Sequence, residues 1–372
     1  MSESARRPLT LDLALQGGGC KGIALNAALA EVMRRGHVIR RIVGTSAGAI
    51  AASLVAAGYT GDELVEMASV VGPDGKLQFA EYVTEPVVPA SPEVEPVITG
   101  LQSAALRLPG DLGQRLLGAA ALLSVLETGG ISSGEGLVSW LTRKLEAKGR
   151  GLSRVTLGEL HASTGRHLTI FAADITSRRL RAINHRTAPA CPLVAAVRMS
   201  MSIPLLFAEV VWREEWGRYL GESLTGHAMV DGGLTSNLPL TFILPGASAL
   251  VAQLMGPPPP GPGVPIGLSI DTSLEVKGAP PPPQESSLGS RLSNSKVGQR
   301  LHALIDTMLL GNDLTFSDTG PTPLCLLPAK GYSAAEFDMT LDRALALLAS
   351  ARTTTARYLD ALEARVESAA LA

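Results

Sequence analysis

A pentapeptide of the pattern G-x-S-x-G constrains the fold of this chain more than any other feature of the sequence. It follows a short apolar segment, residues 42 and 43, and precedes an alanine-rich run, residues 49–57, which Gly58 stops. This order predicts a strand, a sharp turn and a helix with Gly58 as its C-terminal cap. On such a strained turn the serine is held out at the strand end, over the N-terminus of the helix. The pentapeptide consists of Gly44, Thr45, Ser46, Ala47 and Gly48.

The two glycines of this pentapeptide follow from the tightness of the turn, because a side chain at either flank would collide with the backbone. Ser46 is therefore a candidate nucleophile. The pattern alone also fits a plain turn that joins a strand to a helix, so the assignment depends on partner residues elsewhere in the chain.

A glycine-rich loop follows the first predicted strand, residues 11–15, and leads into a predicted helix, residues 23–33. Its backbone N–H groups can converge on one point at the positive end of that helix, where they bind a phosphate or stabilise an oxyanion. The loop contains a literal G-x-G-x-x-G, but no acidic residue follows at the distance that dinucleotide binding requires, and the Walker pattern is absent. The loop consists of Gly17, Gly18, Gly19, Cys20, Lys21 and Gly22.

Beside a serine nucleophile, we interpret this loop as an oxyanion hole with the backbone amides of Gly18, Gly19 and Cys20 as donors. Lys21 either adds a positive field at the loop or fixes the loop by pairing with a carboxylate. The residues alone leave both roles open.

Strand, loop and helix alternate through the first part of the chain, which predicts an α/β fold with a mainly parallel sheet and with its functional loops at one edge. Asp231 ends an apolar segment, residues 226–230, and is followed by Gly232 and Gly233. We expect this carboxylate at the same edge of the sheet as Ser46, as a general base. Asp174 also ends a predicted strand, but an aspartate in that position more often binds turn amides.

The remaining segments predict further elements. Two apolar helices within residues 86–128 form either a lid over the active edge or an addition to the core. These two helices are expected at 101–108 and 116–126. Further expected elements are helices at 299–310 and 341–362 and strands at 168–174, 180–183, 206–211 and 324–327.

We expect a single catalytic domain with two variable regions and short tails. The boundaries are residues 1–10 for the N-terminal tail, 11–366 for the domain, 86–128 for the helical insertion, 256–296 for a proline-rich variable segment and 367–372 for the C-terminal tail.

Composition excludes several classes of function. The net charge of −2 and the isoelectric point near 6.3 give no basic face for nucleic acid. Cys20, Cys191 and Cys325 are odd in number and far apart, so they fit neither a disulfide framework nor a metal site. The N-terminal residues do not form a signal peptide, and every long apolar stretch is interrupted by proline. We therefore expect a cytoplasmic protein without metal or cofactor.

With these motifs in order, the chain resembles the patatin-like phospholipases. The glycine loop is similar to the family's oxyanion block, the pentapeptide to its nucleophile elbow, and residues 231–233 to its catalytic aspartate block. Residues 201–204 and 236–239 are similar to two further family segments, and so is the predicted C-terminal helix after residue 338. Four blocks in the expected order, over residues 11–240, make the resemblance specific.

The resemblance implies a three-layer α/β/α fold and a dyad of Ser46 and Asp231 instead of a triad. It implies hydrolysis of acyl esters in phospholipids or other lipids. The uncharged apolar stretch at residues 238–255 is either a surface connector or a site of transient contact with the inner face of a membrane. A homo-oligomer or an activating partner remains open.

Several alternatives remain at this stage. A Ser–Asp–His triad would need His302, the only histidine after Asp231, and Cys20 could be a nucleophile if the helix N-terminus lowered its pKa. An acyltransferase would use an alcohol in place of water. A lipid-binding or partner-binding module would keep the glycine loop without catalysis.

Overall fold

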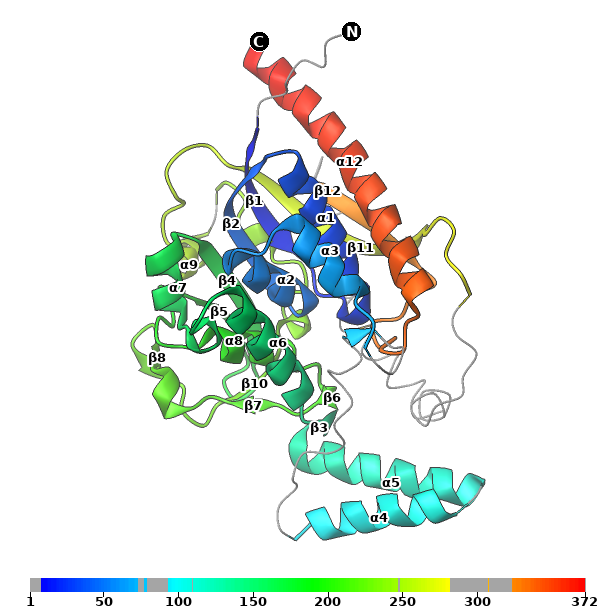
Figure 1. The fold of residues 1–372 in the computed structure, drawn as a ribbon. Helices are drawn as coiled ribbons and strands as arrows, with labels where there is room; N and C mark the ends of the chain where they lie inside the picture. The colour runs from blue at the N-terminus through cyan, green and yellow to red at the C-terminus, as the bar shows by residue number, and fades with distance from the viewer. Residues whose placement is uncertain are drawn as a thin grey trace.

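The computed structural model describes residues 8–72, 77–78, 93–108, 110–246, 248–281, 307 and 323–371. Its centre is an eight-stranded sheet of order β12-β11-β1-β2-β4-β10-β7, in which β5 also pairs with β4 (Figure 1). The strands are β1 (Thr10–Leu15), β2 (Val38–Thr45), β4 (His167–Asp174), β5 (Arg179–Asn184), β7 (Val210–Val211), β10 (Ala228–Asp231), β11 (Val264–Glu275) and β12 (Leu324–Lys330).

The predicted α/β class with a mainly parallel sheet is confirmed. Strands β12, β11, β1, β2 and β4 run parallel to one another, whereas β5, β10 and β7 are antiparallel to their neighbours. The central strands are apolar without alternation, and five of the six residues of β1 are buried. This pattern is typical of a sheet that is covered on both faces.

The two faces can be distinguished on β2. Gly44 lies against α2 (Ala47–Ala56), because a Cβ at this residue would stand 2.4 Å from the carbonyl oxygen of Gly48. Alternate residues point the other way: Thr45 donates a hydrogen bond to the carbonyl oxygen of Ser236, and Arg41 to that of Ile243. A helical layer therefore covers one face, and the segment around η6 (Leu240–Phe242) covers the other.

Most predicted helices are confirmed to within a few residues, and Gly58 ends α2 with a positive φ of 93°. A capping box at Thr60 begins α3. The helices outside the hairpin described next are α1 (Ile23–Arg34), α2, α3 (Gly61–Ser69), α6 (Glu135–Lys148), α7 (Leu157–Thr164), α8 (Leu193–Ser200), α9 (Ala249–Met255) and α12 (Leu341–Leu371).

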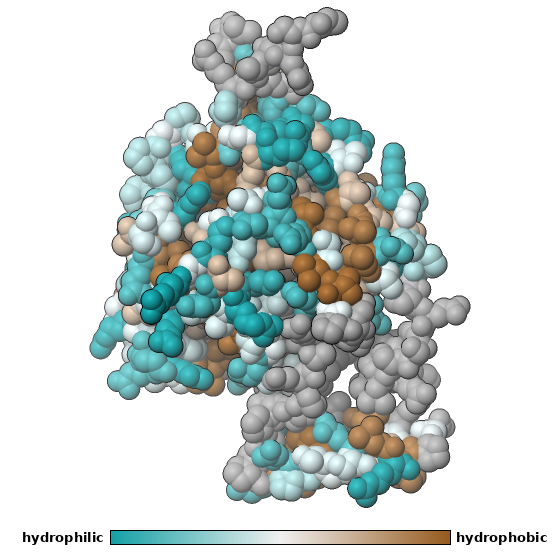
Figure 2. All heavy atoms as spheres, viewed as in Figure 1, coloured by the Kyte–Doolittle hydropathy of each residue, from teal (hydrophilic) through white to brown (hydrophobic). Residues whose placement is uncertain are grey.

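The two helices predicted within residues 86–128 form a hairpin, α4 (Glu95–Arg107) and α5 (Asp111–Thr128), which extends away from the sheet (Figure 1). Ile98 and Ala120 are the buried residues of a small cluster separate from the main core, so the hairpin is not an extension of that core. Hydrophobic side chains are visible on its surface in Figure 2, and Leu106 and Leu122 are exposed. A role as a lid stays a prediction.

The strand predicted over residues 206–211 is wrong as a single element. The chain forms β6 (Leu205–Phe207), which pairs with β3 (Gly130–Ser132), and then β7, which joins the main sheet through β10. The break occurs where the N–H group of Ala208 donates to Ser132 and its carbonyl accepts from Arg198. A second small sheet pairs β8 (Arg218–Tyr219) with β9 (Glu222–Ser223).

The predicted helix at residues 299–310, apart from residue 307, and residues 282–296 of the proline-rich segment lie outside the described residues, as does His302. None of the helices in the described residues combines the length and the apolar character that crossing a membrane requires.

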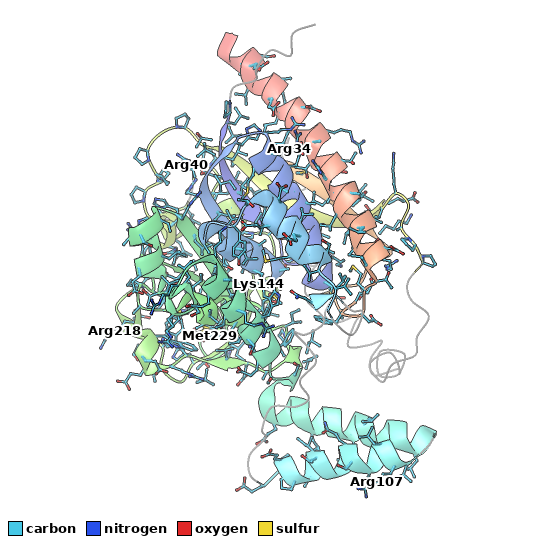
Figure 3. All side chains as sticks on the ribbon, in the orientation of Figure 1. Arg34, Arg40, Arg107, Lys144, Arg218 and Met229 are labelled. Atoms are coloured by element: carbon cyan, nitrogen blue, oxygen red, sulfur yellow. The ribbon has the colours of Figure 1, made fainter. Side chains whose placement is uncertain are left out.

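An ion-pair cluster explains two consecutive arginines inside the sheet. Asp12 of β1 is 1% exposed and accepts hydrogen bonds from Arg40 and Arg41 of the neighbouring β2. Burial alone would raise the pKa of Asp12, but the two guanidinium groups outweigh it and lower this pKa below its usual value. Figure 3 shows Arg40 on β2 and Arg107 far away on the hairpin.

A strap between β12 and α12 crosses the functional edge, and a buried ion pair fixes it. Arg343 of α12 donates to Glu336 at 2.6 Å and 3.1 Å and to the carbonyl oxygen of Gly331 at 2.7 Å. Its guanidinium also lies 4.1 Å from the ring centre of Tyr332, whose hydroxyl donates to the Arg343 carbonyl. These contacts set the position of residues 331–339.

We expect Arg343→Met to lower the free energy of unfolding by about 3 kcal/mol, because it leaves the Glu336 carboxylate buried without its partner. Urea denaturation measures this change. Lys330→Met is the matched control, because Lys330 and Glu275 form an exposed ion pair, and its loss should cost less than about 1 kcal/mol. Equal effects of the two substitutions would contradict the anchoring role of Arg343.

Candidate active site

Ser46 occupies the turn between β2 and α2 with φ 54° and ψ −124°, a backbone conformation that non-glycine residues rarely adopt. The flanking glycines permit it. A Cβ at Gly44 would lie 2.4 Å from the Gly48 carbonyl oxygen, and a Cβ at Gly48 would lie 2.4 Å from that of Leu15. The predicted reason for both glycines is therefore confirmed, and Ser46 is held in a strained turn.

Side chains and carbonyls from distant segments hold this turn in place. The N–H group of Ser46 donates to Ser200 Oγ at 2.9 Å, and Ser200 in turn donates to the carbonyl oxygen of Phe171 at 2.6 Å. On the other side of the strand, Thr45 Oγ1 donates to the carbonyl oxygen of Ser236 at 2.8 Å. Ser200 is the last residue of α8, so this helix positions the serine turn.

Asp231 comes close to Ser46 through an antiparallel strand. In the register of the sheet, Asp231 of β10 pairs with Ala172 of β4, and the preceding β4 residue, Phe171, pairs with Thr45. Parallel strands would have brought their carboxyl ends together at one edge. Here β10 runs back into the sheet, and Asp231 at its end lies one residue beyond the level of Thr45, which is the level of Ser46. An antiparallel strand, and not a shared carboxyl edge, therefore brings the two residues together.

The Asp231 carboxyl group is 1% exposed. Its Oδ1 accepts the N–H of Gly233 at 2.7 Å, while its Oδ2 has no hydrogen-bond partner among the described residues. The Ser46 hydroxyl donates to Met201 Sδ at 3.5 Å in this structure but lies near enough to lower the pKa of Asp231. Burial outweighs this effect and raises the pKa of Asp231 to about 7.

The glycine loop folds as the 3-10 helix η1 (Gly19–Gly22) and packs directly on the serine turn. A Cβ at Gly17 would lie 2.9 Å from the Cβ of Ser46, and a Cβ at Gly22 would lie 2.2 Å from that of Ala47. Gly19 has a positive φ of 54°. The glycines thus bring the loop into contact with the turn.

Some loop amides are already used. Three N–H groups donate to carbonyl oxygens of the protein: Gly17 to Asn237 at 3.0 Å, Cys20 to Ala334 at 2.8 Å and Lys21 to Gly18 at 3.2 Å. The expectation that Cys20 supplies an oxyanion donor is therefore wrong for this structure, because the strap occupies that amide. The N–H groups of Gly18 and Gly19 make no hydrogen bond to another described residue.

The Cys20 thiol is a poor nucleophile. It is 5% exposed, and burial raises its pKa well above the usual value, with Glu336 and Asp338 adding to the increase. The expected lowering of its pKa by the helix N-terminus is outweighed, which argues against the alternative of Cys20 as the nucleophile. The charge of the buried Lys21 opposes the increase, which fits a positive field at the loop.

Asp174 and His227 have structural roles. Asp174 accepts hydrogen bonds from both the N–H and the hydroxyl of Ser177, from Arg181 and from His227. Although burial opposes them, these donors hold the pKa of Asp174 far below its usual value. The carboxylate is saturated as a turn acceptor, as the sequence pattern indicates.

Three histidines offer nitrogen atoms within 4.8 Å of one another: His161, His167 and His185. The rings of His161 and His185 are stacked, with centroids 3.6 Å apart and an interplanar angle of 13°. Lone pairs lie in the ring planes, so two parallel rings do not direct them at one ion. The arrangement is therefore a poor tetrahedral or octahedral metal site as it stands.

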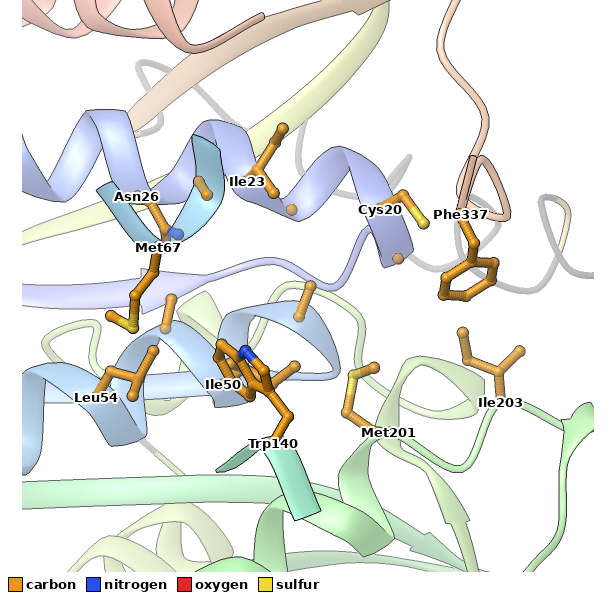
Figure 4. Close-up of a pocket in the computed structure, with 15 residues that line it drawn as sticks. Cys20, Ile23, Asn26, Ile50, Leu54, Met67, Trp140, Met201, Ile203 and Phe337 are labelled. Atoms are coloured by element: carbon orange, nitrogen blue, oxygen red, sulfur yellow. The ribbon is translucent and has the colours of Figure 1, made fainter. Parts of the chain in front are cut away.

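An apolar groove begins beside the serine turn and the glycine loop (Figure 4). The empty space inside it, including the part open to solvent, is about 660 Å³. Its lining residues are Gly19, Cys20, Gly22, Ile23, Asn26, Ala47, Ile50, Ala51, Leu54, Met67, Ala68, Trp140, Met201, Ile203 and Phe337.

Sequence reasoning missed four residues that shape this site. Met201 is the first residue of the segment 201–204, noted above as similar to a family segment, and Ser200 directly precedes it, so their neighbourhood was visible in the sequence. Ala334 and Phe337 come from the strap, about a hundred residues after Asp231. No local pattern marks a carbonyl oxygen that accepts from a distant loop.

A model of the patatin-like phospholipase family matches residues 13–244, which is more than half of the chain. The chain belongs to the patatin-like phospholipase family. It is 29% identical over 237 residues to the uncharacterized protein YqhO of Bacillus subtilis, a match that covers 62% of this chain and 65% of YqhO. The chain thus spans just under two thirds of that relative.

Solved structures with a distant similarity include VipD from Legionella pneumophila, with a TM-score of 0.48 and 14% identity over 96% of this chain and 68% of VipD. The type III effector ExoU gives a TM-score of 0.43 and 16% identity, over 96% of this chain and 53% of ExoU. Human GIVD cytosolic phospholipase A2 gives a TM-score of 0.39 and 13% identity, over 99% of this chain and 60% of the phospholipase.

The strain at Ser46 predicts an unusual order of stability. We expect Ser46→Gly to be more stable than Ser46→Ala by about 1 kcal/mol. Glycine has no Cβ and adopts this backbone conformation without strain, and the strain that is removed exceeds the extra conformational entropy that glycine loses on folding. Both variants lose the hydroxyl group, so each controls for the other. Urea denaturation measures the difference in the free energy of unfolding, and the two variants should show the same dependence of this free energy on urea concentration. A more stable alanine variant would show that the turn is not strained.

Proposed function

We propose that this chain hydrolyses acyl esters of lipids through a dyad of Ser46 and Asp231. The observation that carries the proposal is the second carboxylate oxygen of Asp231, which is buried, without a partner among the described residues, and beside the Ser46 hydroxyl. An unpaired buried acceptor is costly for stability. A role as the acceptor of the Ser46 proton would explain why this oxygen is left without a hydrogen bond despite the loss of stability.

In the first half of the reaction, Ser46 Oγ attacks the ester carbonyl carbon while Asp231 takes the hydroxyl proton. The carbonyl oxygen becomes an oxyanion, and the N–H groups of Gly18 and Gly19 are its proposed donors. The tetrahedral intermediate then expels the alcohol, which receives the proton from Asp231. An acyl group remains on Ser46.

In the second half, a water molecule attacks the acyl carbonyl and gives its proton to Asp231. The intermediate collapses, Ser46 recovers its proton, and the fatty acid leaves. Ser46 has 0% exposure in this structure. The flexible Met201 side chain, which accepts the Ser46 hydroxyl, has to turn aside before an ester carbonyl can reach the nucleophile.

The pKa of Asp231 suits a base at neutral pH. An unperturbed aspartate is too weak a base for efficient proton transfer, whereas a pKa of about 7 combines basicity with a substantial ionised fraction.

Family membership supports phospholipids or other lipid esters as substrates, reached by transient contact with the inner face of a membrane from the cytoplasm. Water and alcohol are both possible acceptors chemically, and hydrolysis is proposed because nothing in the described residues marks an alcohol site. The triad alternative rests on His302, which lies outside the described residues. A homo-oligomer or an activating partner is compatible with this proposal.

The proposal predicts that a fluorophosphonate probe labels the wild-type protein and that mixed phospholipid vesicles release fatty acid. Ser46→Ala should abolish both, and Asp231→Asn should lower hydrolysis by at least about a thousandfold. Ser53→Ala is the matched control, because this buried serine of α2 only donates to the Ile50 carbonyl. Labelling that survives in Ser46→Ala would refute Ser46 as the nucleophile. Loss of hydrolysis in the single variant His302→Ala would favour a triad that includes His302.

The raised pKa of Asp231 predicts two opposite pH effects. Only the ionised carboxylate accepts a proton, so kcat/KM should rise with pH through about 7 as one group titrates. Stability should change in the other direction. The folded-state pKa lies above the unfolded value of 3.8, so the native state binds the extra proton between these two values and stability falls as pH rises toward 7.

Asp231→Asn removes this penalty. We expect it to be more stable than the wild-type protein at about pH 8 by a few kcal/mol, and the difference to shrink toward about pH 4. Thermal denaturation across this pH range measures the change. A difference that does not depend on pH would show that Asp231 has an ordinary pKa.

A further inference from the structure

The groove beside the active site follows one face of α2. Its wall on this helix consists of Ala47, Ile50, Ala51 and Leu54, which are spaced by three or four residues and so lie along one side of the helix. Ala47 directly follows the nucleophile, and Leu54 lies two turns further on. This wall of the groove therefore begins at the residue after Ser46 and runs along α2 away from the serine turn.

The other walls come from three further helices. Ile23 and Asn26 lie on α1, Met67 and Ala68 on α3, and Trp140 on α6. Figure 4 shows Met67, Asn26 and Leu54 together at one end of the groove, and Ile203 and Phe337 at the opposite end.

None of the residues that line the groove carries a charge. The one side-chain amide, that of Asn26, donates to the carbonyl oxygen of Leu64 and thus has a structural partner. Away from the glycine loop, whose Gly19 N–H lies at the near end, a phosphate or another charged headgroup would lose its hydration in this groove without compensation. A hydrocarbon chain, by contrast, gains from leaving water for such a surface.

We propose that this groove binds the acyl chain of the ester substrate and that its far end, at Leu54 and Met67, sets the preferred chain length. The inference rests on the proposed function, because it assigns the acyl part of the substrate to one side of Ser46. The alcohol part then leaves toward Ile203 and Phe337.

The length of the groove sets a scale. Seven residues of helix separate Ala47 from Leu54, about 10 Å at 1.5 Å per residue. An extended chain with carbon–carbon bonds of about 1.5 Å advances about 1.25 Å per methylene, so roughly eight methylenes fit along this wall. The specificity constant should therefore rise steeply up to about the octanoyl ester and change less for longer chains.

Ala51 controls the width halfway along the groove. It is 2% exposed, and its small side chain leaves the space that the acyl chain requires. We expect Ala51→Leu to lower the ratio of kcat/KM for the nitrophenyl dodecanoate to that for the butyrate by at least about tenfold, since the added methylenes block the path.

Leu54→Ala should act in the opposite direction. It extends the far end, so the ratio for hexadecanoate to octanoate should rise by about tenfold. Leu29→Ala is the matched control, because it makes the same truncation in the main core away from the groove and should destabilise without changing either ratio. Unchanged ratios in both groove variants, with hydrolysis that still depends on Ser46, would overturn the inference.

A binding experiment keeps the inference testable when no hydrolysis is found. Trp140 lines the groove, whereas Trp212 and Trp216 contact each other elsewhere. Brominated octanoic acid should quench the tryptophan fluorescence of the Ser46→Ala protein. It should quench little when Trp140→Phe is added to Ser46→Ala, and it should bind at least about tenfold more weakly when Ala51→Leu is added to Ser46→Ala instead. Quenching that persists without Trp140 would place the chain elsewhere and refute the groove.

The two failures are distinguishable. Absence of Ser46-dependent hydrolysis together with quenching through Trp140 would refute the proposed reaction and retain a fatty-chain site. Hydrolysis that depends on Ser46, with chain-length ratios that do not change in the Ala51 and Leu54 variants, would support the proposed reaction and refute the acyl-chain site.

Discussion

The close approach of backbone to backbone around Ser46 is the constraint on which the rest of this structure depends. Gly48 lies so near the end of β1 that no Cβ fits between them, and Gly44 lies equally close to Gly48. This contact fixes the angle at which α2 leaves the sheet and forces Ser46 into its strained conformation. The surrounding hydrogen bonds, above all the one that the Ser46 N–H donates to Ser200, hold the strained conformation in place. Without them the turn would relax at the expense of the geometry.

A second feature of the site also reduces stability. The Asp231 carboxyl group is removed from water and receives one hydrogen bond, where the buried Asp174 receives several. The two residues close neighbouring strands of one sheet, yet their pKa values are moved in opposite directions. The direction depends on the balance at each carboxylate between desolvation, which dominates at Asp231, and hydrogen-bond donors, which include Arg181 at Asp174. Desolvation makes Asp231 basic, and saturation makes Asp174 a structural acceptor.

Much of this arrangement could be predicted from the sequence because it is local. The strand, elbow and helix around Ser46, the glycine loop and the capping box at Thr60 each depend on neighbours within a few residues. The errors concern long-range pairing. The direction of β10 and the acceptor of the Cys20 amide are set by segments far away in the chain, and neither leaves a periodicity or a motif at Asp231 or Cys20. A single sequence contains no signal for such contacts.

Helix α2 links the chemistry to the proposed choice of substrate. The proposed nucleophile, Ser46, is its N-cap residue, and one face of the helix then forms one wall of the groove. Near the elbow, Gly22 and Ala47 already touch, so the groove cannot widen there without moving Ser46. Two turns away, Leu54 is far enough from the elbow to change without that cost. Substitutions that change the preferred acyl-chain length should therefore lie at the far end of the groove. Residues at the near end cannot change without disturbing the serine turn.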